Sequence, residues 1–375
     1  MKKIVALLFA VLLVQLSYGN PTERILSNKA RISVLTCGTG KELYALFGHT
    51  AIRVYDPAQG IDRVYNYGLF DFRTPNFYGK FVKGDLLYFV DYDDYERFVM
   101  NYAYDNRSVV EQELNLSHTQ KQKVWNNLNQ SLKEENRYYI YKFIDQNCTT
   151  KVVDVLNDVL PTPVEISVEG NTATYRTILN TYLKDRYFEM LGINLIFGNK
   201  VDHPSNLLFL PDKFQLGLTQ TKNGNLPLVQ DEITVFQAEQ TENYVWWNTY
   251  WFASLLVLFL MGLAVNNVVR SVYFILFGLL GCFFFLVGFY SLHGELLWNN
   301  VVFLCNPLLI LIPFVKNLNK IKSILGIIVV ILLILYIVLN LYSEKLIITL
   351  PLYLLTLVTL FLEFKPVLQN RVKNK

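Results

Sequence analysis

Several signatures of familiar enzyme classes are missing from this sequence. It has no G-x-S-x-G nucleophile elbow and no H-E-x-x-H zinc helix, and its Gly-Thr-Gly-Lys stretch at 38–41 lacks the spacing of a phosphate-binding loop. Internal repeats and low-complexity tracts are missing too. The sequence therefore does not resemble an elbow-type serine hydrolase, a zincin, a P-loop nucleotide enzyme or a repeat protein.

Cysteine is scarce, with four residues in a chain of 375. Cys282 and Cys305 fall inside apolar segments, where we expect them to act as small hydrophobic residues. Cys37 and Cys148 lie in the more polar first part of the chain. If that part is exported, an oxidising environment allows the two to form a disulfide, and this alternative stays open.

Charge is also low. Charged residues make up 17% of the chain, and the net charge is only +3. Much of the basic excess lies in loops beside long apolar segments. Nucleic acid is therefore not an expected partner.

The N-terminus has the pattern of a secretory signal peptide over residues 1–19. Met-Lys-Lys is followed by an apolar run over residues 4–16 and by Ser-Tyr-Gly at 17–19. An uncleaved anchor is the alternative. No cysteine follows directly after the expected cleavage point, so we do not expect the mature protein to be a lipoprotein itself.

Long apolar stretches follow Trp246 and predict five membrane spans, at residues 247–265, 271–292, 296–315, 324–341 and 346–364. Arg270, Lys316, Lys320, Lys322 and the basic residues after 364 would all be cytoplasmic by the positive-inside rule. Five spans then place the preceding domain outside and the C-terminus inside. We therefore expect a multi-pass protein of a bacterial inner membrane with its first domain in the periplasm.

The third apolar stretch is irregular because it contains Asn-Asn at 299–300 and Asn-Pro at 306–307. These residues bring polar groups and a missing backbone donor into the membrane. Either the span is kinked or it lines a polar groove that faces the periplasm. His293 and Glu295 lie at the start of this region and are either solvated loop residues or substrate-binding residues.

Residues 20–246 have the pattern of a separate mixed α/β domain. Apolar alternation predicts strands at 32–35, 50–55, 63–69 and 86–90, the second and third joined as a hairpin by the turn residues Asp56-Pro57 and Gly60. Helical spacing predicts helices at 95–104, at 119–132 behind Ser117, and at 148–160.

A cysteine and a histidine of this domain carry the strongest chemical signal. Cys148 starts a predicted helix behind Asn147, a good N-cap residue, and a thiol at the positive end of a helix has a lowered pKa. His49 begins a predicted strand, and Gly48 before it permits close approach of another element. Together they predict a thiolate–imidazole pair for acyl transfer through a thioester. Structural roles for both residues are the alternative.

A third polar group should orient the imidazole. Asn66 is our prediction, because it lies on the strand that pairs with the histidine strand. Asp56 is the second choice.

Several motifs resemble the Lnb family of membrane-embedded lipoprotein N-acyltransferases, which carry an N-terminal periplasmic domain. These motifs are Leu-Thr-Cys-Gly at 35–38, Phe-Gly-His-Thr-Ala-Ile-Arg-Val at 47–54, Tyr-Asn-Tyr-Gly-Leu-Phe-Asp-Phe at 65–72, Asn-Cys-Thr-Thr at 147–150 and Phe-Leu-Pro-Asp at 209–212. With the apolar tail, the resemblance extends over nearly the whole chain. The order of histidine strand, polar residue and cysteine helix is also similar to circularly permuted papain-like domains of the NlpC and lecithin:retinol acyltransferase type.

The resemblance implies an α+β chain, with a circularly permuted papain-like periplasmic domain at 20–246 and an all-α transmembrane domain of five helices at 247–375. His49 and Cys148 would be the catalytic pair, and an acyl chain would pass from a phospholipid to the α-amine of a diacylglyceryl-modified lipoprotein. Both partners are membrane lipids, and neither a cofactor nor a metal is expected. The other candidate site residues are Asn66 as the third catalytic residue, Asn147 and Thr149 at the helix start near the oxyanion, and Arg53, Tyr67, His293 and Glu295 for substrate binding.

Two alternatives remain. A cysteine peptidase or amidase acting on cell-wall peptides would explain the cysteine and histidine, but it would leave five spans without a purpose. A non-enzymatic, membrane-tethered binding protein would use Cys37 and Cys148 as a stabilising disulfide.

Overall fold

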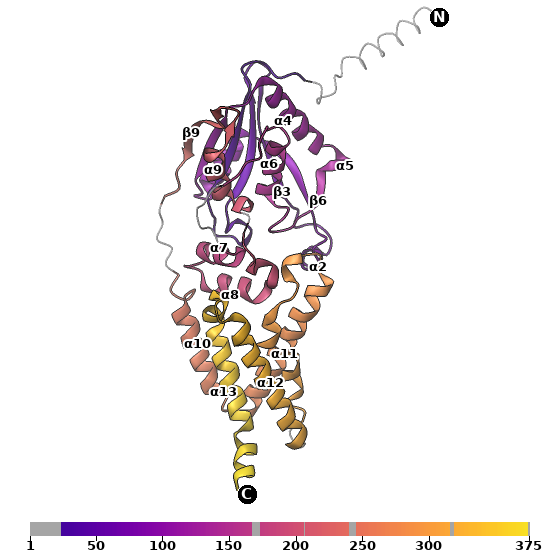
Figure 1. Ribbon diagram of the computed structural model, residues 1–375, viewed down its shortest axis with the longest axis vertical. Coiled ribbons are helices and arrows are strands. Elements are labelled where there is room, and N and C mark those ends of the chain that lie inside the picture. The colour runs from indigo at the N-terminus through magenta and orange to yellow at the C-terminus, as the bar shows by residue number, and fades with distance from the viewer. Residues whose placement is uncertain (1–23, 167–172, 206, 240–244, 316–318, 374–375) are drawn as a thin grey trace, which may run out of the picture. The chain divides into compact units, whose positions relative to one another are not determined.

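The computed structural model describes residues 24–166, 173–205, 207–239, 245–315 and 319–373 (Figure 1). It divides into two compact units. The first unit comprises residues 1–77, 86–169 and 207–240, and the second comprises residues 78–85, 170–206 and 241–375. The predicted domain boundary near residue 246 therefore differs from this division, because the described residues 78–85 and 173–205 group with the C-terminal part. The predicted signal peptide lies outside the described residues.

A seven-stranded antiparallel sheet forms the first unit, with the order β6-β4-β3-β2-β1-β5-β9. The predicted hairpin is confirmed, since β2 and β3 pair from Ala51–Asn66 to Asp56–Ile61. The strands are β1 (Arg31–Cys37), β2 (His49–Asp56), β3 (Ile61–Leu69), β4 (Leu87–Asp94), β5 (Val109–Leu114), β6 (Tyr138–Ile140) and β9 (Val229–Phe236), with β7 (Lys222–Asn223) and β8 (Leu226–Pro227) forming a small separate ribbon.

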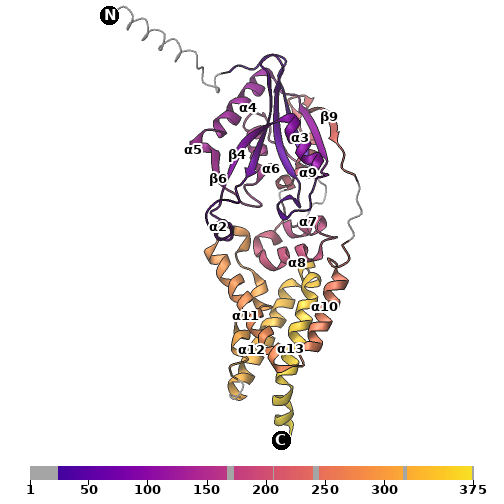
Figure 2. The same cartoon turned by 180° about the vertical axis from the view of Figure 1, so that it is seen from behind.

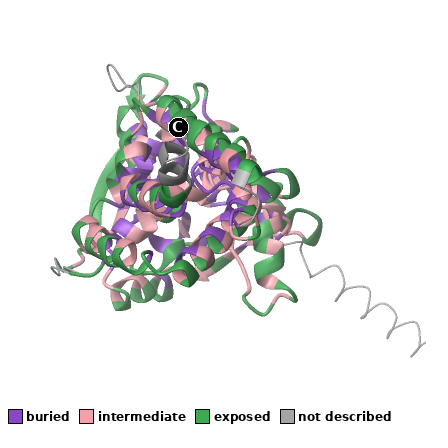
Figure 3. Ribbon diagram, turned by 90° about the horizontal axis from the view of Figure 1, so that it is seen from below, coloured by how far each residue is buried: buried purple, intermediate pink, exposed green. Residues whose placement is uncertain are grey.

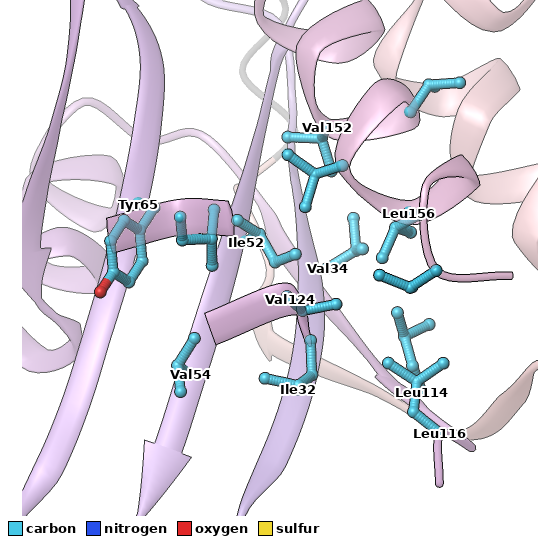
Figure 4. Packing of buried hydrophobic residues seen from close by; sticks show 14 of the residues in the cluster. Ile32, Val34, Ile52, Val54, Tyr65, Leu114, Leu116, Val124, Val152 and Leu156 are labelled. Atoms are coloured by element: carbon cyan, nitrogen blue, oxygen red, sulfur yellow. The ribbon is translucent and has the colours of Figure 1, made fainter. Parts of the chain in front are cut away.

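Helices cover both faces of this sheet, as the opposite views in Figures 1 and 2 show. On one face, α4 (His118–Ser131) and α6 (Cys148–Asn157) bury alternate strand residues such as Ile52 and Val54 (Figure 4). On the other face, α3 (Tyr95–Tyr104) packs Phe98 against Ala51 and Val64. The alternation of β2 therefore places consecutive residues in two different cores.

The predicted helices of this unit are confirmed, with small differences at their ends. The bounds of α3 are those predicted, and α4 begins behind Ser117, which forms a capping box with Gln120. The unit also contains α5 (Glu134–Arg137), α9 (Pro211–Gln220) and the 3₁₀ turns η2 (Leu43–Ala45) and η4 (Leu207–Phe209).

The second unit is mainly helical. Three of its helices are long and apolar enough to cross a membrane, over Asn267–Tyr290, Lys320–Asn340 and Glu344–Pro366. Many of their large apolar side chains are exposed, such as Leu276, Ile327 and Phe361. Figure 3 colours the described residues by burial. The α-helices of this unit are α2 (Phe77–Lys83, whose first residue belongs to the first unit), α7 (Tyr175–Tyr182), α8 (Tyr187–Ile196), α10 (Tyr250–Leu263), α11 (Asn267–Tyr290), α12 (Asn319–Asn340) and α13 (Glu344–Lys373). The 3₁₀ turns are η3 (Asn199–Asp202), η5 (Gly294–Leu296), η6 (Asn300–Phe303) and η7 (Pro307–Leu311).

Within the described residues, three helices and not five are long and apolar enough to span a membrane, so the predicted five spans are not confirmed. The first predicted span is α10, whose 14 residues rise only about 21 Å, short of the roughly 30 Å hydrocarbon layer. The third predicted span is wrong as a helix, since residues 294–311 form the three 3₁₀ segments η5, η6 and η7.

The glycines of α11 explain how this irregular segment is accommodated. A Cβ atom at Gly281 would lie 1.6 Å from the carbonyl oxygen of Cys305, so only glycine allows the two backbones to touch. The side chains of Asn299 and Asn306 accept hydrogen bonds from the backbone N–H groups of Val301 and Leu308. Non-helical backbone is tolerated in a membrane when it is buried in protein and its polar groups are bonded. Val301, Leu304 and Cys305 of this segment are buried, and the two asparagine caps pair backbone N–H groups.

Candidate active site

Cys148 is the first residue of α6, as predicted. The side chain of Asn147 accepts a hydrogen bond from Thr150 N, and the Thr150 hydroxyl accepts one from Asn147 N. The other end of the Asn147 amide donates to the carbonyl oxygens of Phe143 and Phe209, at 2.8 and 2.9 Å. The N-cap role of Asn147 is confirmed, and its four bonds fix the start of the helix in place.

The thiol of Cys148 is acidic for a cysteine. Burial raises its pKa, but the charge and hydrogen bond of His49, the backbone of Thr50 and the hydroxyl of Thr149 lower it further than burial raises it. The net result lowers the pKa from 9.0 to about 7. A large fraction of Cys148 is therefore thiolate, the nucleophilic form, near neutral pH.

His49 is the first residue of β2, opposite Cys37 of β1. Gly48 before it has φ +81°, and a Cβ atom there would lie 2.6 Å from the carbonyl oxygen of Cys37, so the expected close approach at this glycine is present. The Nε2 atom of His49 lies 3.2 Å from Oδ1 of Asn66, a buried residue of β3. The structure thus brings Cys148, His49 and Asn66 together. As predicted, His49 interacts with Cys148 on one side and with Asn66 on the other.

Asp56, the second choice for the orienting residue, is occupied elsewhere. Its carboxylate accepts hydrogen bonds from the backbone and hydroxyl of Ser27, both at 2.6 Å, and from Ala58 N at 3.1 Å. These contacts fix a turn at the far end of β2, and they leave Asn66 as the residue that bonds His49.

Replacing Asn66 with alanine should slow the reaction that this site catalyses without abolishing it. A net hydrogen bond contributes about 1 kcal/mol, which corresponds to roughly a fivefold change in rate. Turnover of Asn66→Ala by the purified full-length protein would test this. Aspartate at this position should retain more activity than alanine, because it still accepts from the imidazole. Full activity of the alanine variant would mean that another group orients His49.

Tyr102 is a residue of the site that sequence reasoning missed. Its ring stacks on the His49 imidazole, with centroids 6.3 Å apart and planes 13° from parallel. Its hydroxyl hydrogen-bonds the Cys37 thiol, and burial raises the pKa of Tyr102 well above its usual value. The only signal in the sequence is its place in the amphipathic pattern of α3, which does not indicate contact with a histidine 53 positions earlier.

The second cysteine of this unit is not poised for chemistry. Burial raises the pKa of Cys37 to about 12, so its thiol stays protonated at neutral pH. Both Cys37 and Cys148 are free thiols in the structure. The Cys37–Cys148 disulfide that the alternative requires is therefore not present in the structure.

Thr149 is fully buried, and its hydroxyl lies 3.0 Å from that of Thr50. The same hydroxyl lies 4.0 Å from the sulfur of Cys148. This side chain therefore ties α6 to β2 beside the reactive sulfur. An oxyanion role at this position would fall to the backbone N–H groups of Cys148 and Thr149, because Thr150 N and Lys151 N already donate to Asn147.

Arg53 lies in an ion-pair network on β2. Its guanidinium donates to Asp62 at 2.7 and 2.8 Å and to Glu111 at 3.0 Å, and it stacks 3.3 Å from the ring centroid of Tyr95. The Tyr95 hydroxyl donates to the same Glu111 carboxylate. These contacts are structural, and a substrate contact for Arg53 stays a prediction that they do not support.

Replacing Arg53 with methionine should destabilise the fold, because it leaves the Glu111 carboxylate, 8% exposed, without its cation. Such a loss costs about 3 kcal/mol, or a fall in Tm of roughly 6–12 °C for a domain of this size. Thermal unfolding of the full-length protein measures it. If the Tm is unchanged while the Michaelis constant for substrate rises, Arg53 contacts substrate instead.

Tyr67 is also buried, and its hydroxyl donates to the Ser131 hydroxyl at 2.9 Å. This bond ties β3 to the end of α4. The predicted role of Tyr67 in substrate binding is not what its contacts indicate.

His293 and Glu295 belong to the second unit. The imidazole of His293 bonds the carbonyl oxygen of Phe81 at 3.0 Å, and the buried carboxylate of Glu295 lies 3.9 Å from Lys200 Nζ. Neither is therefore a freely solvated loop residue. Among the residues that the structure describes, no group of three or more His, Cys, Asp or Glu side chains could hold a metal ion.

Comparison with known families gives one result. Residues 18–181 match the model of the Lnb N-terminal periplasmic domain. This match covers less than half of the chain and includes His49, Asn66 and Cys148. No curated protein and no solved structure matches the chain.

Proposed function

We propose that this chain is a membrane protein of the Lnb family and a lipoprotein N-acyltransferase that uses a cysteine thioester. The observation that carries the proposal is the Cys148 thiol at the start of α6, with a pKa of about 7 and His49 beside it. The hydrogen bond between His49 and Asn66 completes a nucleophile, a base and an orienting group. The order of these residues along the chain also supports a circularly permuted papain-like fold for the first unit.

In the first half of the reaction, the Cys148 thiolate attacks the carbonyl carbon of a phospholipid ester. A carbon–sulfur bond forms, and the negative charge moves to the carbonyl oxygen, near the N–H groups of the first turn of α6. The carbon–oxygen ester bond then breaks. His49 protonates the departing glycerol oxygen, so a lysophospholipid leaves and a thioester remains on Cys148.

In the second half, the α-amino group of a diacylglyceryl-cysteine attacks the thioester. His49 accepts the proton from nitrogen, the carbon–sulfur bond breaks, and the thiolate is restored as the amide forms. The donor and the acceptor both reside in a bilayer. This explains why such an enzyme would carry helices long and apolar enough to cross a membrane, of which the described residues form three.

The test is incubation of the purified full-length protein with acyl-labelled phospholipid, followed by addition of a synthetic diacylglyceryl-cysteine peptide. We expect a hydroxylamine-sensitive label on Cys148 that then moves to the peptide amine as a stable amide. Lipoproteins from cells without the protein should be lighter by one acyl chain than those from cells with it, as measured by intact mass analysis. Cleavage of cell-wall peptides without any acylation of Cys148 would instead favour a peptidase or amidase.

A further inference from the structure

The second unit contains an open cavity of about 810 Å³, within the size range of small-molecule sites. Several of its apolar wall residues, Phe289 and Val338 among them, are more than half exposed. One part of its wall is apolar and comes from α11, α12 and the irregular segment between them. It includes Phe285 and Phe289 of α11, Trp298 and Phe303 of the irregular segment, and Val338 and Leu339 of α12. Side chains of this kind suit an acyl chain.

The other part of the wall is polar. It contains Arg176 of α7, Asp202 of η3, Asn300 of η6, Asn340 of α12 and Glu344 of α13. Asn300 donates to the Asn340 amide oxygen at 3.0 Å and accepts from Lys345 Nζ at 2.6 Å. A single cavity therefore presents a hydrogen-bonded polar end and an apolar end, which is the pattern of an amphipathic ligand.

The charges at the polar end are not equally accessible. Arg176 is 2% exposed and is held by both carboxylate oxygens of Asp202, by Asn194 and by two backbone carbonyls. Lys345 is completely buried. Asp202 has a side chain that is 32% exposed, and Glu344 is exposed. Both cations are thus engaged by protein partners, Arg176 by Asp202 and Lys345 by Asn300. The accessible charged oxygens are those of Asp202, which is paired with Arg176, and of Glu344.

The irregular wall of the cavity is held in place before any ligand arrives. The Asn299 amide donates to the carbonyl oxygens of Leu195 and Ile196, and Gly198 N donates to the carbonyl oxygen of Glu295 at 2.7 Å. Trp298 has φ +56°, an uncommon conformation for a bulky residue, and it is 74% exposed beside Phe289. Strain of this kind persists only where surrounding structure imposes it, and it recurs at ligand sites.

We infer that this cavity binds an amphipathic lipid whose polar end carries a primary ammonium group. The ammonium faces the carboxylates of Asp202 and Glu344, and the acyl chain lies along Phe285, Phe289 and Val338. Two sources share this chemistry: a phospholipid with an ethanolamine headgroup, and the free α-amine of a diacylated N-terminal cysteine. The second source rests on the proposed function, whereas the first does not.

The test is a lipid-binding measurement on the full-length Cys148→Ala protein in detergent, by native mass spectrometry. The probes are phosphatidylethanolamine, phosphatidylglycerol with the same chains, and a diacylglyceryl-cysteine peptide with a free or an acetylated amine. We expect a preference of at least tenfold for the ammonium in at least one of two pairs. The pairs are phosphatidylethanolamine against phosphatidylglycerol, and the free-amine peptide against the acetylated peptide. The pair that shows the larger ratio identifies the source.

Matched variants locate the binding. Val338→Trp fills the cavity and should weaken ammonium-lipid binding at least tenfold. Val330→Trp, on the same helix, exposed and outside the cavity wall, should leave it unchanged. Glu344→Gln keeps the oxygen that accepts from Asn180 but removes the charge, so it should reduce the preference for the ammonium. Glu344→Gln also tests the site if the Val338→Trp variant does not fold.

Equal binding of ammonium and non-ammonium lipids, or equal loss in the two tryptophan variants, would overturn the inference. Because Cys148 is absent from the protein used, binding is measured without transfer. If binding matches expectation but the native protein transfers no acyl chain, the proposed function fails and the lipid site stands.

Discussion

Cys148→Ala and His49→Ala should each abolish acyl transfer. The first removes the sulfur that would carry the acyl chain in the proposed reaction. The second removes the group that lowers the pKa of the thiol and that would move the proton. Loss of one member of a nucleophile–base pair costs roughly 10³-fold or more in turnover. Transfer of labelled acyl chains to the diacylglyceryl-cysteine peptide measures it.

Cys37→Ser is the matched control for loss of a thiol. Cys37 is buried and protonated, and a serine hydroxyl retains a partner for Tyr102. We expect this variant to keep most of the activity, and all three variants to unfold within a few degrees of the native protein. Retention of transfer by Cys148→Ala in a folded protein would rule out the thioester mechanism.

The second large effect is on the pH dependence of Cys148 alkylation. In the native protein the rate should rise with pH through about 7, because the thiolate reacts and the pKa is about 7. In His49→Ala the charge and the hydrogen bond are lost while burial remains, so the midpoint should move to 9 or above. The thiolate fraction at pH 7 then falls about 50-fold. The rate falls by less, because a more basic thiolate is a better nucleophile.

The measurement is the rate of alkylation by iodoacetamide. Peptide mass spectrometry gives this rate separately for each cysteine. Cys37 is the internal control, since its pKa of about 12 keeps it unreactive over the whole range. Asn66→Ala should shift the midpoint much less than His49→Ala. An unchanged midpoint in His49→Ala would show that the helix start and Thr149 account for the low pKa without the imidazole.

Local features of the first unit could be predicted well. The β2–β3 hairpin followed from the alternation on either side of Gly60, and the start of α6 followed from Asn147 preceding an apolar helical pattern. Strands β5 and β9 were not predicted, although both lie in the main sheet. Strand pairing depends on distant partners, and β9 is an exposed edge with little alternation in its burial.

The membrane part was predicted less well, for a related reason. An apolar run of about 20 residues satisfies a hydropathy criterion whether or not it is helical. Residues 294–311 do not form one continuous helix, and they pack on the glycine face of α11. There Gly281 lets the Cys305 carbonyl pack directly on the helix. That contact joins segments that are separate in the sequence.

By itself, the sequence determined which residues start helices, which alternate along strands, and that a cysteine and a histidine have the chemistry for acyl transfer. These properties depend on near neighbours in the chain. Only the tertiary structure decided that His49 contacts Cys148, Asn66 and Tyr102, that Arg53 is held by Glu111, and that an open cavity of about 810 Å³ has carboxylates at one end. Each of these results from packing between distant segments, whose geometry no local pattern specifies.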